Sequence, residues 1–67
     1  MSEEDMLICD DMLRYGDIVS DNEYIIDGAC YRQYVINVEG MMGRIYSYHL
    51  TKKNGRWIYI HCEGIVN

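Results

Sequence analysis

The first fifteen residues place their apolar side chains at the spacing of an α-helix. Met6, Cys9 and Leu13 fall on one stripe, which predicts a short helix over residues 2–15. Gly16, which follows directly, is a suitable helix stop. A helix of about four turns is marginal alone in water, so its apolar stripe must pack on another element.

After Gly16 the period of the apolar residues changes to two, which is typical of β-strands. Asp27-Gly28 and Asn54-Gly55 are tight-turn signals between such runs. A loop is expected at residues 39–43, where glycines flank a pair of methionines. The strand segments predicted from these runs are residues 18–19 before a turn at 20–22, then 23–26, 30–38, 44–51 and 56–62.

The same alternation predicts which side chains share a face of the sheet. On the last strand, one face is expected to carry Ile58, Ile60 and Cys62, and the other Trp57, Tyr59 and His61. On the two strands before it, the first face is expected to carry Tyr34, Ile36, Val38, Tyr46, Tyr48 and Leu50. One face is therefore aliphatic enough to accept the helix, and the other gathers aromatic and polar groups.

These patterns predict an α+β fold, in which a short N-terminal helix packs on a twisted antiparallel β-meander of three to five strands. A small open SH3-like β-barrel is the alternative arrangement. The chain is expected to form one domain over residues 1–67, with the helix at about 2–15 and the meander at about 17–66. A domain of this size buries only about 60% of the surface of its unfolded chain. Little room is left for a substrate pocket beside the core, which disfavours an enzyme.

Charge is distributed unevenly along the chain. Nine of the eleven carboxylates lie in residues 1–27, where Arg14 is the only basic residue, so that segment has a net charge of −8. Residues 28–67 have a net charge of +3, which gives −5 for the whole chain. A separation this strong in a small protein creates an electrostatic field that selects charged partners.

The residue spacing favours neither a metal site nor a catalytic one. His49, His61 and the cysteines lack any Cys-x-x-Cys or His-x-x-x-His spacing, and the adjacent His61 and Cys62 point to opposite faces of a strand. Residues 17–28 fail as a calcium loop because Asn22 occupies the sixth position, where glycine is required. We therefore predict no catalytic residues, no metal ligands and no cofactor, and interpret the chain as a non-enzyme.

The location of the protein is predicted from what the chain lacks. It contains no run of about 20 apolar residues, so no membrane span is expected. The acidic start of the chain is unlike a signal peptide, which favours a cytoplasmic location, in the host cell if a phage encodes it. Cys9, Cys30 and Cys62 are then expected as buried, reduced thiols, with a Cys30–Cys62 disulfide as the minor alternative.

The last hairpin carries a small basic and aromatic tip. Lys52, Lys53 and Arg56 surround the Asn54-Gly55 turn, and Trp57 is adjacent. Such a tip can touch phosphate and stack on a base. The isoelectric point near 4.7 argues against direct nucleic-acid binding as the main activity. Lysines at a hairpin end more often protect a sheet edge, and we interpret these in that way.

The acidic segment is the strongest functional signal in the sequence. A row of carboxylates can imitate spaced phosphates and enter a basic groove that normally holds DNA or RNA. Interleaved tyrosines would supply desolvated anchors, and the methionine loop would supply an adaptable apolar contact. The residues predicted to bind the partner are Asp10, Asp11, Asp17, Asp21, Glu23, Asp27, Tyr15, Tyr24, Tyr31, Met41 and Met42.

Three alternatives to this hypothesis stay open. The carboxylates can serve solubility alone, or they can pair with the basic hairpin of a second copy in a homodimer. One methionine of the loop can instead fold under and close the core. A different function is that of a structural or regulatory interaction module, which binds a protein partner or a second copy of itself through its Tyr/Trp face and the methionine loop, with its acidity serving solubility only.

In size and charge the chain resembles the small acidic proteins that phages and other mobile elements use against host nucleic-acid enzymes. Their targets include restriction enzymes, CRISPR effectors, DNA glycosylases and RNA polymerase. The resemblance covers no specific residue pattern. It implies an inhibitor that blocks the basic nucleic-acid-binding surface of a protein partner, without binding nucleic acid itself.

Overall fold

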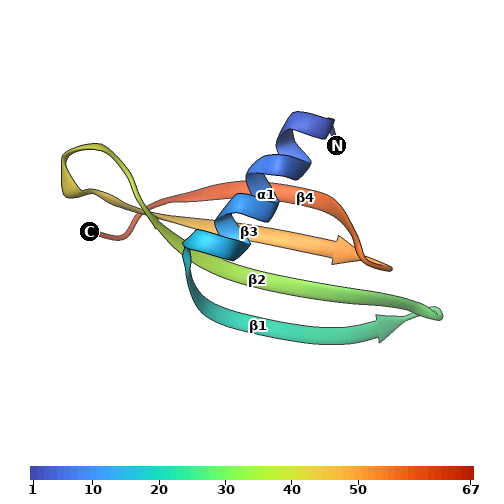
Figure 1. The fold of residues 1–67 in the computed structure, drawn as a ribbon. Coiled ribbons are helices and arrows are strands. Elements are labelled where there is room, and N and C mark those ends of the chain that lie inside the picture. The colour runs from blue at the N-terminus through green and yellow to red at the C-terminus, as the bar shows by residue number, and fades with distance from the viewer.

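One helix and four strands make up the protein, and the computed structural model describes all of residues 1–67 (Figure 1). The elements in chain order are α1 (Glu3–Tyr15), β1 (Asp17–Ile26), β2 (Ala29–Glu39), the short 3-10 turn η1 (Met41–Gly43), β3 (Ile45–Lys53) and β4 (Arg56–Ile65). The strands form one antiparallel sheet in the order β1-β2-β3-β4, with α1 across one face. The predicted α+β meander is confirmed. No helix is long and apolar enough to cross a membrane.

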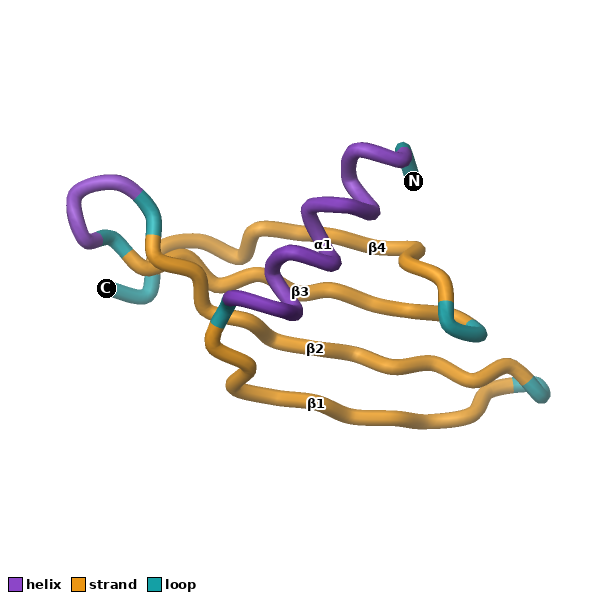
Figure 2. Tube along the Cα trace, in the orientation of Figure 1, coloured by secondary structure: helices purple, strands orange, loops and turns teal.

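The alternative of a small barrel is wrong. β1 and β4 lie at opposite edges of the sheet and do not pair with each other (Figure 1). The two hairpin turns lie together at one end of the sheet, while the β2–β3 loop and the C-terminus lie at the other (Figure 2). Because α1 already covers the apolar face, that face does not have to curl onto itself to be buried.

Both ends of α1 are specified by local chemistry. The Asp5 amide donates to Ser2 Oγ at 3.1 Å, which caps the start of the helix as the sequence Ser2-x-x-Asp5 indicates. Gly16 ends the helix, as predicted, with an extended backbone at φ −77°. A Cβ at this position would collide with the side chain of Ile36 and with the Met12 carbonyl oxygen. Glycine is therefore needed here because α1 approaches β2 closely.

The core is one layer of side chains between α1 and the sheet. Its six buried apolar residues are Cys9, Met12, Tyr34, Ile36, Leu50 and Trp57. Met6 and Leu13 from the helix pack against this cluster, as the predicted stripe requires. Burying one large apolar side chain contributes about 1.5–3 kcal/mol, so a core of this size leaves a thin stability margin.

The turn predicted at residues 20–22 is wrong, because β1 runs without a break from Asp17 to Ile26. Asp21 and Asn22 pair with residues of β2, and Val19 forms a bulge between the paired residues Ile18 and Ser20. β1 is an edge strand, so its polar side chains reach water without leaving the sheet. Pairing with the eleven residues of β2 therefore overrides the local turn preference.

The faces predicted for β4 are wrong at Trp57. Thr51 pairs with Tyr59, but the next residue, Lys52, pairs with Trp57, so Ile58 is an extra, bulged residue. The bulge reverses the alternation of side chains along the strand. Trp57 consequently turns away from the face of Tyr59 and enters the core, where it is only 7% exposed. The remaining strands keep the predicted alternation.

Trp57 connects β4 to the helix. Its indole Nε1 donates to Asp10 Oδ1 at 2.7 Å, and the ring contacts Tyr34 with a centroid separation of 5.8 Å. Lys52 Nζ also lies 4.5 Å from the centre of the Trp57 ring. Asp10, which was predicted to contact a partner, is therefore part of the fold.

Removing the Asp10 carboxylate should destabilise the protein. We expect Asp10→Ala to lower the free energy of unfolding by about 1–3 kcal/mol, because the indole N–H loses a charged acceptor. Asp11→Ala is the matched control, since it removes a neighbouring exposed carboxylate and should change stability by less than about 0.5 kcal/mol. Urea denaturation of the two variants compares them directly, and equal effects would show that the bond contributes nothing.

The three cysteines are free thiols in three different environments. Cys9 is buried as predicted, and its burial raises the thiol pKa to about 11. The Cys30 thiol donates to Glu23 Oε1 at 3.2 Å, and this hydrogen bond raises its pKa. Cys62 is exposed, so the expectation that all three are buried is wrong. No disulfide joins Cys30 in β2 to Cys62 in β4, because β3 lies between these strands.

These environments imply an order of thiol reactivity. The thiolate is the reactive form, so exposure and a low pKa both accelerate labelling. We expect Cys62 to react first with a thiol reagent, Cys30 more slowly, and Cys9 only after unfolding. Mass spectrometry of the time course identifies the labelled residue, and early labelling of Cys9 would contradict the packing of α1.

Candidate partner-binding site

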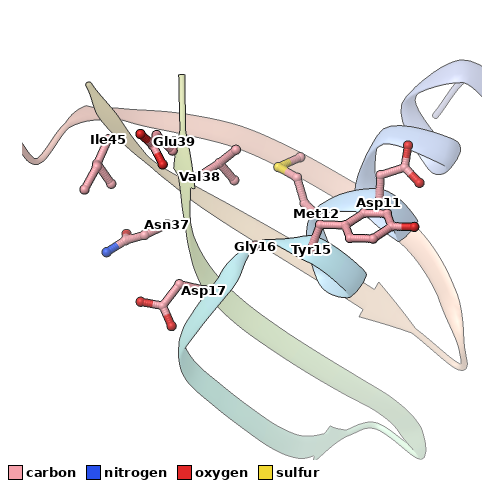
Figure 3. Close-up of a pocket in the computed structure, with 9 residues that line it drawn as sticks. All are labelled: Asp11, Met12, Tyr15, Gly16, Asp17, Asn37, Val38, Glu39 and Ile45. Atoms are coloured by element: carbon pink, nitrogen blue, oxygen red, sulfur yellow. The ribbon is translucent and has the colours of Figure 1, made fainter. Parts of the chain in front are cut away.

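A groove lies at the end of the molecule where α1 passes into β1 (Figure 3). It has a volume of about 560 Å³ and is open to solvent along one side. The last turns of α1, the first residue of β1, the end of β2 and the start of β3 supply its walls. Met12, Val38 and Ile45 make the apolar part of its lining.

Three carboxylates surround this groove. Asp11 comes from α1, Asp17 from β1 and Glu39 from β2, and all three side chains are exposed. Figure 3 shows Asp11 on the helix side of Gly16, and Asp17 and Glu39 on the strand side. No basic residue lines the groove, and none of the three carboxylates forms an ion pair within the chain. Their negative charge is therefore available to a cationic partner.

Exposed apolar side chains adjoin the carboxylates. Tyr15 at the end of α1 is 78% exposed, and Met41 and Met42 in η1 are 82% and 88% exposed. η1 begins two residues after Glu39. The alternative in which a methionine closes the core is therefore wrong. We call the surface formed by the three carboxylates and these three side chains the acidic end.

The methionine loop has a defined backbone. Met42 has a left-handed conformation with φ 61°, which is uncommon for a residue with a side chain. Gly43 also has a positive φ, of 71°, and Gly40 packs so closely on the ring of Tyr46 that a Cβ would overlap it. The loop thus presents both methionine side chains to solvent just after Glu39 in the chain, although neither lines the groove.

The other carboxylates that were predicted to bind the partner lie away from the groove. Asp21 is held by Arg32 through two hydrogen bonds, of 2.9 and 2.8 Å. Glu23 accepts from the Cys30 thiol, as described above. Asp27 lies in the β1–β2 turn, at the opposite end of the sheet from the acidic end. Of the predicted carboxylates, Asp11 and Asp17 therefore line the groove, and Asp21, Glu23 and Asp27 do not.

Arg32 changes the acidity of its partner. Its hydrogen bonds to Asp21 hold the pKa of that carboxyl below the ordinary 3.8. A carboxyl with a lowered pKa stabilises the fold above the unfolded pKa, and this contribution disappears as pH falls through the folded pKa. The guanidinium also lies 5.5 Å from the centre of the Tyr34 ring, which anchors it on the helix side of the sheet.

Substitution of Arg32 should return Asp21 to ordinary acidity. In an NMR titration of the side-chain carboxyl, we expect the Asp21 midpoint below 3.8 in the natural chain and a rise toward that value in Arg32→Gln. Arg56→Gln removes a basic residue that forms no ion pair and should leave the Asp21 midpoint unchanged. An unchanged midpoint in Arg32→Gln would exclude the pair as the cause.

Tyr24 and Tyr31 lie on the sheet face opposite α1, and neither lines the groove. Their rings stack with centroids 5.4 Å apart and an angle of 6° between planes. Lys53 Nζ lies 5.7 Å from the centre of the Tyr31 ring. We call the sheet face opposite α1, which carries Tyr24, Tyr31, Thr51 and Tyr59, the open face. These two tyrosines therefore do not interleave with the carboxylates of the acidic end.

Sequence reasoning missed Glu39 as a member of the groove. Its position at the end of the longest predicted strand, next to Gly40, is the signal that could have indicated it. A second bulge in β4, between the pairs Ser47–Gly64 and Tyr48–Cys62, brings Glu63 Oε2 within 3.5 Å of His61 Nε2 and 4.0 Å of His49 Nε2.

Across the whole chain, no group of three or more His, Cys, Asp or Glu side chains is arranged to hold a metal ion. The structure establishes the fold class of the protein: it is a small α+β protein with one helix on an open, four-stranded antiparallel sheet. No protein-family profile, curated protein or solved structure matches the chain. The function therefore has to be argued from the surfaces described above.

Proposed function

We propose that this protein is a small acidic binding protein that blocks a nucleic-acid enzyme, in the manner of phage and mobile-element inhibitors. In this proposal the acidic end occupies the basic surface on which the enzyme holds DNA or RNA, and the substrate is excluded. The observation that carries it is the groove in which Asp11, Asp17 and Glu39 gather without any internal cation.

Electrostatics supports a basic protein surface as the partner. An enzyme that binds nucleic acid holds phosphates with arginine and lysine, and carboxylates at the acidic end offer these side chains equivalent acceptors. An arginine fork can bind a carboxylate while its aliphatic stem lies on the Met12 and Val38 side chains of the groove. Displacement of counterions from both surfaces adds to the free energy of association.

The apolar side chains of the acidic end supply binding affinity, which charged side chains alone do not provide. Charged rims mainly accelerate association and select the partner, whereas buried aromatic and aliphatic anchors provide most of the affinity. Tyr15 has a large ring at low entropic cost, and Met41 and Met42 adapt their shape to a partner's crevice. Together they make an interaction that includes desolvated contacts as well as ion pairs.

The lining of the groove favours binding over catalysis. Its titratable side chains are carboxylates and one tyrosine, and it contains no cysteine, serine, histidine or lysine to act as nucleophile or base. The carboxylates are exposed, whereas acid–base chemistry with paired carboxylates needs one in an environment that raises its pKa. We therefore propose that the protein acts without catalysing a reaction.

Inhibition of an enzyme provides the test. Purified CRISPR effectors and restriction enzymes are incubated with the protein before DNA is added, and cleavage is measured at increasing salt. We expect inhibition of the susceptible enzyme to compete with DNA and to decrease as salt screens the ion pairs. The triple variant Asp11→Lys, Asp17→Lys, Glu39→Lys should inhibit roughly a hundredfold less, because each reversal places like charges together.

Each of the three reversals made singly should also weaken inhibition. Asp27→Lys is their matched control, since it makes the same change of charge in the turn at the opposite end of the sheet and should leave inhibition unchanged. Circular dichroism confirms that each variant is folded. Full inhibition by a folded triple variant would overturn the electrostatic mechanism. Titration with an arginine-rich peptide, followed by amide NMR shifts, locates the cation site directly, and shifts confined to Asp27 or to Glu3 and Glu4 would exclude the groove.

A further inference from the structure

The open face is a second surface with a different chemistry. Asn22, Gln33, Thr51 and Tyr59 lie side by side across its centre, one from each strand. Fourteen residues line the shallow hollow that crosses it, and Glu63 is the only Asp, Glu, Lys or Arg among them. In the whole chain 25% of residues are charged. A face with few charged residues and many tyrosines has the composition that is typical of the core of a protein interface.

The net charge of the chain limits what can cover this face. Two copies of a chain with charge −5 repel each other unless their carboxylates point away from the contact. Face-to-face packing of two open faces keeps α1 and its carboxylates on the outside of both sheets. By strand register Asp17 and Glu39 belong to the open face, at the same end as Glu63, so they stay clear of its centre. A strongly charged partner such as nucleic acid finds little to bind on the neutral centre of the face.

The two ends of the open face carry opposite charges. Lys53 lies at the hairpin end, where it pairs with Tyr31 and Arg56, and Glu63 lies at the far end beside His49 and His61. About five residues of strand separate the two charges, roughly 17 Å at about 3.3 Å per residue. The face is therefore complementary to itself when it is turned end for end.

We propose that the open face is a homodimer interface in which two copies pack their sheets together with opposite strand directions. A two-fold axis perpendicular to the strands places Lys53 of each copy opposite Glu63 of the partner subunit. The other two-fold axis, along the strands, places the basic ends together and the acidic ends together, which like-charge repulsion disfavours. This proposal does not depend on the inhibitory function.

The geometry of twisted sheets suits this contact. Two sheets pack face to face about 10 Å apart with their strands about 30° from alignment, because each sheet is twisted. Tyr59, which is 49% exposed, supplies a large side chain near the centre of the contact. A face of four strands and about eight residues covers roughly 19 by 26 Å, the small end of the range for stable interfaces. We therefore expect an equilibrium between monomer and dimer that depends on concentration.

Sedimentation velocity over a dilution series of the full chain provides the test. We expect a dimer that dissociates on dilution, and a monomer at the same concentrations for Tyr59→Glu. Tyr15→Glu is the matched control, because it places the same charge at an exposed tyrosine on the helix side and should leave the dimer intact. A protein that is monomeric at every concentration, or a dimer that Tyr59→Glu does not weaken, overturns the proposal.

Charge exchange at the two ends tests the orientation. At low ionic strength, Lys53→Glu and Glu63→Lys should each raise the dimer dissociation constant roughly tenfold, because each puts like charges together twice per dimer. The double variant should return to within about threefold of the natural chain. Failure of the double variant to recover overturns the end-for-end arrangement.

Failure of this proposal is separable from failure of the inhibitory function. Tyr59→Glu should keep full inhibition, whereas Asp11→Lys, which reverses the groove carboxylate on α1, should weaken inhibition and keep the dimer. A monomeric protein that binds a single-stranded oligonucleotide through Tyr24 and Tyr31 would also overturn it, and amide NMR shifts on the open face would reveal that outcome.

Discussion

The packing of α1 on one face of the sheet is the contact on which the rest of the structure depends. It buries nearly the whole core in a single layer, and Trp57 and Asp10 connect that layer from β4 to the helix. Gly16 allows the approach by leaving space for the side chain of Ile36. Without the helix, a four-stranded sheet of this length would expose its apolar face, and the tyrosine-rich open face alone would not hold the strands together.

One-sided packing also determines which surfaces are free to bind. The helix covers one face, so the other face and the end where α1 joins β1 are the two places without internal partners. They differ in chemistry: the acidic end combines carboxylates with exposed methionines, and the centre of the open face is nearly uncharged. This separation permits the molecule to recognise a basic partner with one surface and a neutral one with the other.

Counting carboxylates along the chain overstates the charge that a partner meets. Asp10 accepts from Trp57, Asp21 is neutralised by Arg32, and Glu23 accepts from Cys30. A carboxylate that already has a partner in the fold loses that contact if it turns to another protein, which opposes binding. The groove carboxylates carry no such cost, which is why the proposed function depends on Asp11, Asp17 and Glu39 rather than on the whole acidic segment.

Local patterns in the sequence determined the helix, its cap at Ser2, its stop at Gly16, the tight turns and the meander, because each of these is specified by residues close in the chain. They also located the acidic segment and the exposed Met41-Met42 loop. Tertiary structure decided the continuous β1, the bulge at Ile58 that buries Trp57, and the pairing of Arg32 with Asp21. Bulges and ion pairs of this kind depend on strand register, which is set by partners distant in sequence. For the same reason only the folded chain places Glu39 on the groove with Asp11 and Asp17 and leaves Tyr24 and Tyr31 outside it.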